Sequence, residues 1–403
     1  MNATPPEVTD PVRSPELRTA HLFAQFVERE ASGVPLPGRS TAHRFAVLSA
    51  LGRRDLSLAR LAEGHLDAAA ILHELDDSLP TEKERWGVWA ARPPGPGVHA
   101  TRSDRGWRIS GVKPYCSGAR SCTHALVTAD ADDGYRLFAV ALDHPGARAV
   151  EGTWPAIGMA GSDSLDMSFT DVPARAVGEV DGYMLRPGFQ HGGIGVAACW
   201  LGGAHAVAAP LYGRAAAGQL NGHAAAHLGA VDMLLHTADT VLRQAGDAID
   251  ADPFDVREEA RVRSLRVRAL AEKVCTEVLE HVGRATGAGP LCRDERHARA
   301  VADLTVYVRQ HHAESNLAEL GRLATTDFPA ASATTDSANV TNPLAATGPA
   351  ASTDPAANVA NVANVANVAN VANVANVANV ANAANAATAA NADPTITAAE
   401  AAR

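Results

Sequence analysis

The chain has 403 residues, of which 46% are hydrophobic and 20% charged, and its formal net charge is −10. This length and apolar content are enough for two or three packed domains. General nucleic-acid binding is disfavoured, because Lys and Arg are spread along an acidic chain and are not gathered in one stripe.

The N-terminal stretch and the cysteines bear on where the protein works. Residues 1–15 are rich in proline and carry neither the basic region nor the apolar core of a secretory signal. No segment has about eighteen uninterrupted apolar residues, so we expect no membrane span. The five cysteines form neither a CxxC pair nor a disulfide framework, which predicts reduced thiols, no metal site and a cytoplasmic protein.

Residues 16–80 predict a small helical domain. Apolar residues recur at helical spacing in stretches that begin near Pro15, Thr41 and Asp55. Pro35 and Pro37 end the first of these patterns.

A compact β unit is expected over residues 81–182. From Trp86 the apolar period changes towards that of a strand, and Pro93 with its neighbours enforces a loop. Short β-rich runs between Gly106 and Pro173 are interrupted by Asp and Gly. Helical sequence flanks this unit on both sides, so the rest of the chain should pack around it.

Residues 183–324 predict a four-helix bundle. The first helix is rich in Ala and Gly, whose small side chains let helices approach closely, and Pro210 predicts a kink within it. The four antiparallel helices are expected over residues 193–220, 224–249, 256–283 and 295–323.

Residues 325–403 form a low-complexity tail. Its composition falls to Ala, Thr, Ser, Asn and Pro, and from Asn358 an Asn-Val-Ala triplet repeats. A period of three drifts about 60° per triplet around an α-helix, so no apolar face forms. We therefore predict a disordered tail, and a repeat expansion without a role is favoured over a binding function.

The order of these domains, together with three motifs, resembles the acyl-CoA dehydrogenase family over residues 16–323. The first motif has Gly111 and Lys113 before the aromatic Tyr115 and the hydroxyl of Ser117. The second is Gly-Met-Ala-Gly-Ser-Asp-Ser at 158–164, followed by Phe-Thr-Asp-Val-Pro at 169–173. The third is Tyr-Gly-Arg-Ala-Ala-Ala-Gly at 212–218. The resemblance implies an α+β protein with N-terminal helices, a small central β-barrel or sandwich, and a C-terminal four-helix bundle.

The resemblance also implies FAD as the cofactor. It puts Tyr115 against the flavin ring, with Ser117 and Gly118 at the polar edge of that ring. A flat isoalloxazine needs one apolar wall and a few fixed donors, which suits these residue types. Each residue also has an ordinary interpretation, Tyr115 as a core aromatic and Ser117 as a turn residue.

Other positions follow from the same resemblance. Arg214 would meet the cofactor diphosphate across a subunit boundary, which implies a homodimer or homotetramer. Gly287 and Gly289 lie where the family lets the backbone approach the cofactor, although they could equally form a helix C-cap and loop. Ser162 and Asp163 are the implied substrate contacts. Arg214 could equally be a structural ion-pair residue.

Two departures concern the chemistry. The family's Thr-Glu and Gly-Ser-Asp loop on its first strands is replaced here by the segment from Trp86 to Gly97, which removes a hydroxyl near flavin and acyl carrier. Dehydrogenation also needs a carboxylate that removes an α-proton. The family's base follows an Arg-Asp pair by about two turns of a helix. Counting from Asp303 reaches His311, and the nearest carboxylate is Glu314.

Several functions remain open at this stage. With Glu314 as base, or His311 in its place, the chain would dehydrogenate an acyl-CoA or acyl-carrier thioester and could pass electrons to an electron-transfer flavoprotein. A His at this position also resembles flavin-dependent monooxygenases of the same fold. A member that has lost its base and acts as a binding or scaffold subunit is the alternative from another class. His311 and Glu314 could also be part of a solvated helix face.

Overall fold

The computed structural model describes residues 14–92, 95 and 97–324. Residues 14–91 and 97–324 belong to one unit, whereas Arg92 and Gly95 belong to a second one. The features below all lie in the first unit. The predicted disordered tail lies outside the described residues.

The N-terminal helices surround a layer of apolar side chains. They are α1 (Pro15–Arg29), α2 (Thr41–Arg54) and α3 (Leu56–Asp76), with a short turn η1 (Ala31–Gly33) after the first. Asp55 caps α3, because its carboxylate accepts the Leu58 N–H at 2.9 Å. Phe23, Phe45 and Leu58 are buried, so the helical spacing in the sequence corresponds to the core-facing side.

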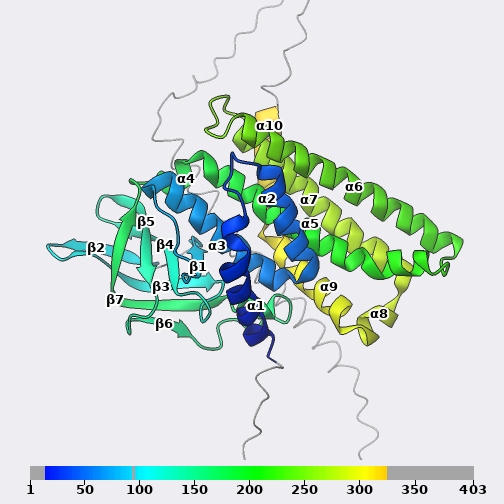
Figure 1. Cartoon of the computed structure of the whole chain (residues 1–403), viewed down its shortest axis with the longest axis horizontal. Helices are drawn as coiled ribbons and strands as arrows, with labels where there is room; N and C mark the ends of the chain where they lie inside the picture. Colours follow the sequence, from blue (N-terminus) through cyan, green and yellow to red (C-terminus); the bar gives the residue numbers. More distant parts are fainter. Residues whose placement is uncertain (1–13, 93–94, 96, 325–403) are drawn as a thin grey trace, which may run out of the picture. The chain divides into compact units, whose positions relative to one another are not determined.

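The central strands form a small closed barrel (Figure 1). They run in the order β1-β4-β2-β3-β7-β5, and β5 also pairs with β4, which closes the ring. β6 pairs with β7 outside the ring. The strands are β1 (Trp86–Trp89), β2 (His99–Ser103), β3 (Gly106–Cys116), β4 (His124–Ala131), β5 (Gly134–Ala141), β6 (Ala147–Val150) and β7 (Leu165–Val177).

The C-terminal helices pack around α5, the most apolar helix. After the short helix α4 they are α5 (Pro187–Ala216), α6 (Gly222–Ala251), α7 (Ala260–Thr286), α8 (Ala288–Arg293) and α9 (Glu295–Tyr307). α4 spans Gly182–Leu185, and α10 spans Ala313–Ala324. Pro210 lies inside α5. The predicted fold class, with helices, a small β-barrel and a C-terminal helical domain, is confirmed.

The prediction of one helix over residues 295–323 is wrong. α9 ends at Tyr307 and passes into a 3-10 turn, η3 (Val308–Gln310); His311 is then extended, and Ala313 at the start of α10 has φ of +40°. The break buries His311, which is 3% exposed. The segment between α9 and α10 contains no Gly or Pro, the residues that usually signal such a break.

Among the described helices, α5 is long and apolar enough to cross a membrane. Its most apolar window is 72% buried inside the protein, as expected for the central helix of a bundle. Length and composition are therefore weak evidence for a membrane span here.

We expect the contact between α2 and α5 to depend on glycine. A Cβ on Gly202 would lie 2.1 Å from the Ser49 carbonyl oxygen, whereas one on Gly213, in the same helix, meets no atom within 4 Å. Gly202→Ala should lower the free energy of unfolding by about 1–3 kcal/mol. Gly213→Ala should leave it unchanged or raise it by up to about 1 kcal/mol. Denaturant unfolding measures both, and equal effects would contradict the close packing.

Candidate functional site

Tyr115 lies where the pairing of β3 with β7 is interrupted. The register shifts between Lys113 and Cys116, and Tyr115 has φ of +58°, in the left-handed region that a bulky residue rarely adopts. Its N–H points at an Asp166 carboxylate oxygen 3.4 Å away. The ring is half-buried, and burial raises the pKa of the Tyr115 hydroxyl. Strained backbone of this kind costs about 1–3 kcal/mol and is often found at functional sites.

The residues after Tyr115 are held against the second β-domain motif. The Gly118 N–H donates to the Ser162 carbonyl at 2.8 Å, and the Ser117 carbonyl accepts the Trp89 indole N–H at 3.0 Å. Gly118 has φ of +73°, and a Cβ there would lie 2.8 Å from the Cys122 sulfur. The structure therefore brings Tyr115, Ser117 and Gly118 next to the 158–164 segment.

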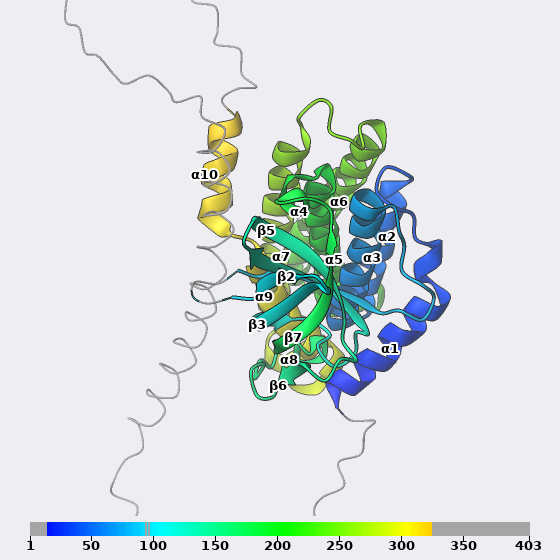
Figure 2. The same cartoon turned by 90° about the vertical axis from the view of Figure 1, so that its left-hand side faces the viewer.

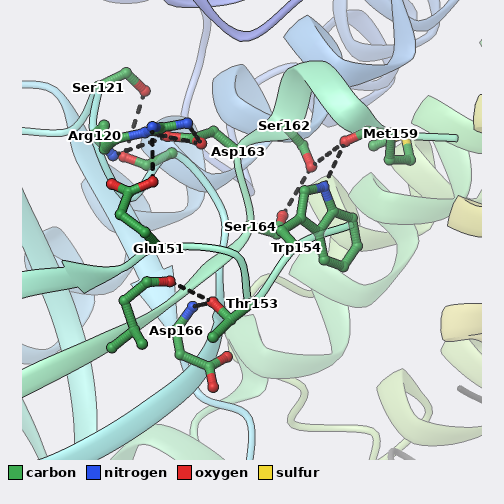
Figure 3. Close-up of polar contacts among 12 residues, drawn as sticks. Arg120, Ser121, Glu151, Thr153, Trp154, Met159, Ser162, Asp163, Ser164 and Asp166 are labelled. Carbon is green, nitrogen blue, oxygen red and sulfur yellow. Dashed lines mark hydrogen bonds and ion pairs between the residues drawn. The ribbon is translucent and has the colours of Figure 1, made fainter. Parts of the chain in front are cut away.

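Three buried serine hydroxyls form a chain with one direction. The Ser162 hydroxyl donates to the Met159 carbonyl at 2.8 Å and lies 2.8 Å from the Ser164 hydroxyl (Figure 3). The Ser164 hydroxyl lies 2.9 Å from that of Ser117. Because the Ser162 proton is used by Met159, Ser164 must donate to Ser162, and Ser117 must donate to Ser164. The Ser117 oxygen is then left with lone pairs only. Ser164 did not emerge from sequence reasoning, although it ends the motif that contains Ser162.

Asp163 points away from these serines. Figure 3 shows its carboxylate turned towards Arg120, whose Nη2 lies 2.6 Å from it. The Arg120 backbone N–H also donates to this carboxylate at 3.1 Å. Asp163, a predicted substrate contact, thus forms an ion pair with Arg120, whereas Ser162 is part of the serine chain.

The 158–164 segment is fastened to the bundle through Asp303 on α9. The Met159 N–H donates to the Asp303 carboxylate at 2.5 Å, and a Cβ on Gly158 would lie 2.2 Å from the Ala302 carbonyl oxygen. Asp303 is 3% exposed, and burial raises its pKa from 3.8 to about 6. Ala302 and Asp303, which stand at the position of the family's Arg-Asp pair, therefore join the β domain to α9.

Asp303 should make stability depend on pH. Its pKa is higher in the folded protein than the value of 3.8 expected when unfolded, so its protonated form favours folding below about pH 4. That contribution is lost as the pH rises through about 6, by about 2–3 kcal/mol. Asp303→Asn keeps an acceptor for Met159 and does not titrate. Unfolding at pH 4 and pH 7 should show the wild type losing stability relative to the variant, and parallel curves would contradict this.

Arg214, Gly287 and Gly289 lie elsewhere. Arg214 is in the last turn of α5, and Gly287, with φ of +64°, ends α7. In Figure 1 the turn between α7 and α8 lies at the opposite end of the bundle from the barrel, and α5 ends on that side too. The chain does not bring these residues to Tyr115, so only a second subunit could do so.

The two predicted catalytic residues differ in burial. Glu314 is exposed in the first turn of α10, which Figure 2 shows at the edge of the molecule. His311 is buried, and burial together with Arg268 lowers its pKa to about 4. Its Nδ1 accepts the Ala313 N–H at 3.2 Å. The neutral ring therefore carries its proton on Nε2, which has no hydrogen-bond partner among the described residues.

His311 belongs to a buried polar cluster that sequence reasoning missed. Its buried members are Glu63 of α3, Trp200 of α5, Tyr307 of α9 and His311, and the half-buried Arg60 of α3 and Arg268 of α7 complete it. The guanidinium of Arg268 lies 4.8 Å from the Trp200 ring centre, and Trp200 meets Tyr307 and His311 edge-on at 6.2 and 6.5 Å between ring centres.

Arg60 and Glu63 form the ion pair of this cluster, 2.6 Å apart. Burial raises the pKa of Glu63 to about 7, although Arg60 opposes this shift. The signal in the sequence was a charged pair, one helical turn apart, among the Leu and Ala residues of the first half of α3.

A small hollow connects the polar cluster with the serine chain. It has room for about one water molecule. Its lining includes Arg60, Ser117 and residues Trp86 to Val88 of β1. β1 thus occupies the place where the sequence departs from the family's Thr-Glu strand.

The comparisons identify the fold. No protein-family model matches the chain, and no curated protein matches it by sequence. Three matching solved structures are a nitrososynthase from Micromonospora carbonacea var. africana, FMN-bound TdsC from Paenibacillus sp. A11-2, and butyryl-CoA dehydrogenase from Megasphaera elsdenii. Their identities are 19%, 16% and 16%, and their TM-scores are 0.64, 0.63 and 0.65. The matches cover 79%, 79% and 81% of this chain and 93%, 98% and 100% of theirs. The chain therefore has the acyl-CoA dehydrogenase-like fold.

Proposed function

We propose that this protein is a flavin-dependent oxidoreductase. The observation that carries the proposal is the meeting of two β-domain motifs, in which Gly118 and Ser117 bond to Ser162 and Ser164 while the Tyr115 ring, two residues before Ser117, stays half-buried. The proposal is supported by matches of the same fold that include an FMN-bound protein and a butyryl-CoA dehydrogenase. A bound flavin would supply electron and hydride chemistry that amino-acid side chains cannot.

The residues present suit a flavin. Tyr115 offers a flat apolar wall, and the direction of the serine chain leaves the Ser117 oxygen as an acceptor, which matches an N–H group of the ring. Arg214 of a second subunit would suit the diphosphate of FAD, which FMN lacks. We therefore keep FAD as the proposed cofactor, with a homodimer as the smallest complete unit.

The position of His311 favours monooxygenation over acyl-thioester dehydrogenation. Glu314 is exposed, and His311 presents Nε2–H, a donor, where dehydrogenation needs a proton acceptor. Glu63 is a buried carboxylate near the site, but Arg60 holds it at 2.6 Å. Neutral His311, within electrostatic range of Arg268 and Arg309, suits a substrate or intermediate that bears negative charge.

Anaerobic reduction separates the two reactions. If the protein is a monooxygenase, butyryl-CoA leaves the bound flavin yellow. The protein then consumes externally reduced flavin in a reaction that depends on oxygen. Bleaching by butyryl-CoA would instead support dehydrogenation. In that case we would compare three variants, one for each possible proton acceptor: Glu314→Gln, His311→Gln and Glu63→Gln. The base is the residue whose replacement abolishes bleaching.

Ser117→Ala should weaken flavin binding by about fivefold to tenfold, the value of one ordinary hydrogen bond. Ser121→Ala is the matched control, because the Ser121 hydroxyl is also buried but bonds only to the Gly118 carbonyl at 3.4 Å. Fluorescence titration with FAD measures both dissociation constants. Equal affinities of the two variants would remove Ser117 from the flavin site.

A further inference from the structure

The buried polar cluster holds an excess of unused hydrogen-bond donors. Arg60 Nε, Trp200 Nε1 and His311 Nε2 have no partner among the described residues, and each carries a hydrogen on the tautomer derived above. The Tyr307 hydroxyl lies beside the Cys199 thiol, and no hydrogen bond of ordinary geometry reaches it within the described chain. Trp200, Tyr307 and His311 are 0%, 1% and 3% exposed.

These donors are costly unless something binds them. A buried polar group without a partner costs about 1–3 kcal/mol, and most such groups in folded proteins are satisfied. Here several lie close together, because both the Tyr307 and the His311 ring pack edge-on against the Trp200 ring. Tyr307 also lies within electrostatic range of Arg60, Glu63 and Arg268. The missing partner must therefore offer acceptors.

The charges of the cluster point the same way. Arg60 and Arg268 contribute two positive charges, and Glu63 contributes at most one negative charge. Arg268 is oriented by donating to the Gly193 carbonyl at 2.7 Å, with the Trp200 ring beneath its guanidinium. An anion entering the cluster would find net positive charge and several donors.

Through Arg60 the cluster borders the proposed flavin site. Arg60 lines the hollow that Ser117 also lines, and its side chain is 16% exposed. A group bound by Arg60 would thus lie between the serine chain and the bundle.

We infer that Arg60, Trp200, Tyr307 and His311 form the substrate subsite of the proposed flavin enzyme, and that it takes the anionic oxygen of a small carboxylate or phenolate. This inference names the substrate class and rests on the proposed function. Arg60 binds the charge, Glu63 fixes Arg60, and the remaining donors orient the oxygen. All are positioning residues, since no covalent step is assigned to them.

Binding of simple carboxylates tests the subsite. We would titrate the purified protein, with and without FAD, with formate, acetate and benzoate in a carboxylate-free buffer. Their amides serve as uncharged counterparts of the same shape. The carboxylates should bind saturably and raise Tm, with amides weaker by about tenfold or more. The size series reports the room available at the subsite.

The key variant is Tyr307→Phe, which removes a buried hydroxyl and little else. Tm of the ligand-free variant should be equal or higher, while carboxylate affinity should fall by about tenfold. Tyr212→Phe is the matched control, because Tyr212 is 37% exposed and bonds to Asp232 at 2.9 Å. It should bind carboxylates as the wild type does.

Three results would overturn the subsite: no saturable binding of any carboxylate, equal binding of amides, or unchanged affinity in Tyr307→Phe. Each would leave bound water as the partner of these donors. Flavin titration is measured separately. Flavin binding without carboxylate binding removes only the subsite, whereas carboxylate binding without flavin binding removes only the proposed function.

Discussion

Arg60→Met is expected to destabilise the protein strongly at pH 8 and weakly at pH 5. The substitution leaves the buried carboxylate of Glu63 without its partner, and breaking a buried ion pair in this way costs about 3–5 kcal/mol. Burial already raises the pKa of Glu63 to about 7 in the presence of Arg60, and without Arg60 it should rise further. A proton can then replace the arginine, so the cost is avoided at acid pH.

The sign of the pH dependence follows from this shift. A carboxyl group whose pKa is higher when folded favours folding in its protonated form, and that contribution is lost as the pH rises through the folded pKa. Urea unfolding at pH 5 and pH 8 should therefore show the larger loss at pH 8. Arg60→Met combined with Glu63→Gln should recover most of it. Arg54→Met, an exposed arginine on α2, controls for the substitution itself. Equal losses at both pH values would show that the pair is not coupled.

Arg214→Ala should weaken FAD binding by about tenfold to a hundredfold, the value of charge-assisted bonds to a phosphate. Tm should change little, because the side chain lies at the end of α5, away from the core. The reason for the loss is specific. Arg214 is in the last turn of α5, and Figure 1 shows that α5 ends on the side of the bundle away from the barrel, whose strand β3 carries Tyr115, so Arg214 would serve the flavin of a second subunit.

A mixed dimer separates this arrangement from an arginine that acts within its own chain. Tyr115→Ala and Arg214→Ala homodimers should each bind FAD weakly. In a purified dimer of one subunit of each kind, one site keeps both native residues and the other loses both. One tight FAD per two chains is the expected result. No tight site would mean that Arg214 does not act across a subunit boundary.

The helices and strands were largely predictable from apolar spacing, because burial follows it closely. In α3 the apolar positions face the core, and the strands of the β unit expected over residues 81–182 form a barrel, one of the two arrangements expected. The break after Tyr307 was not predictable, since it uses a 3-10 turn and a positive φ at Ala313 without Gly or Pro. Because of that break, counting residues along one continuous helix does not give the positions of His311 and Glu314.

The cofactor side of the site was easier to predict than the opposite side. Tyr115 and Ser117 follow each other in one motif, so the sequence shows them together. Arg60, Trp200 and Tyr307 come from three helices, and each alone is indistinguishable from a core or surface residue of its type. Only the packing of α3, α5 and α9 shows that their donors converge.

Flavin titration of the purified chain tests the central proposal most directly. FAD and FMN are each titrated into the protein and followed by the visible spectrum and by quenching of flavin fluorescence. The proposed function predicts saturable binding at about one flavin per chain, tighter for FAD, and weakened by Tyr115→Ala. A protein that takes up neither flavin, or binds flavin equally well after Tyr115→Ala, would contradict the site described here.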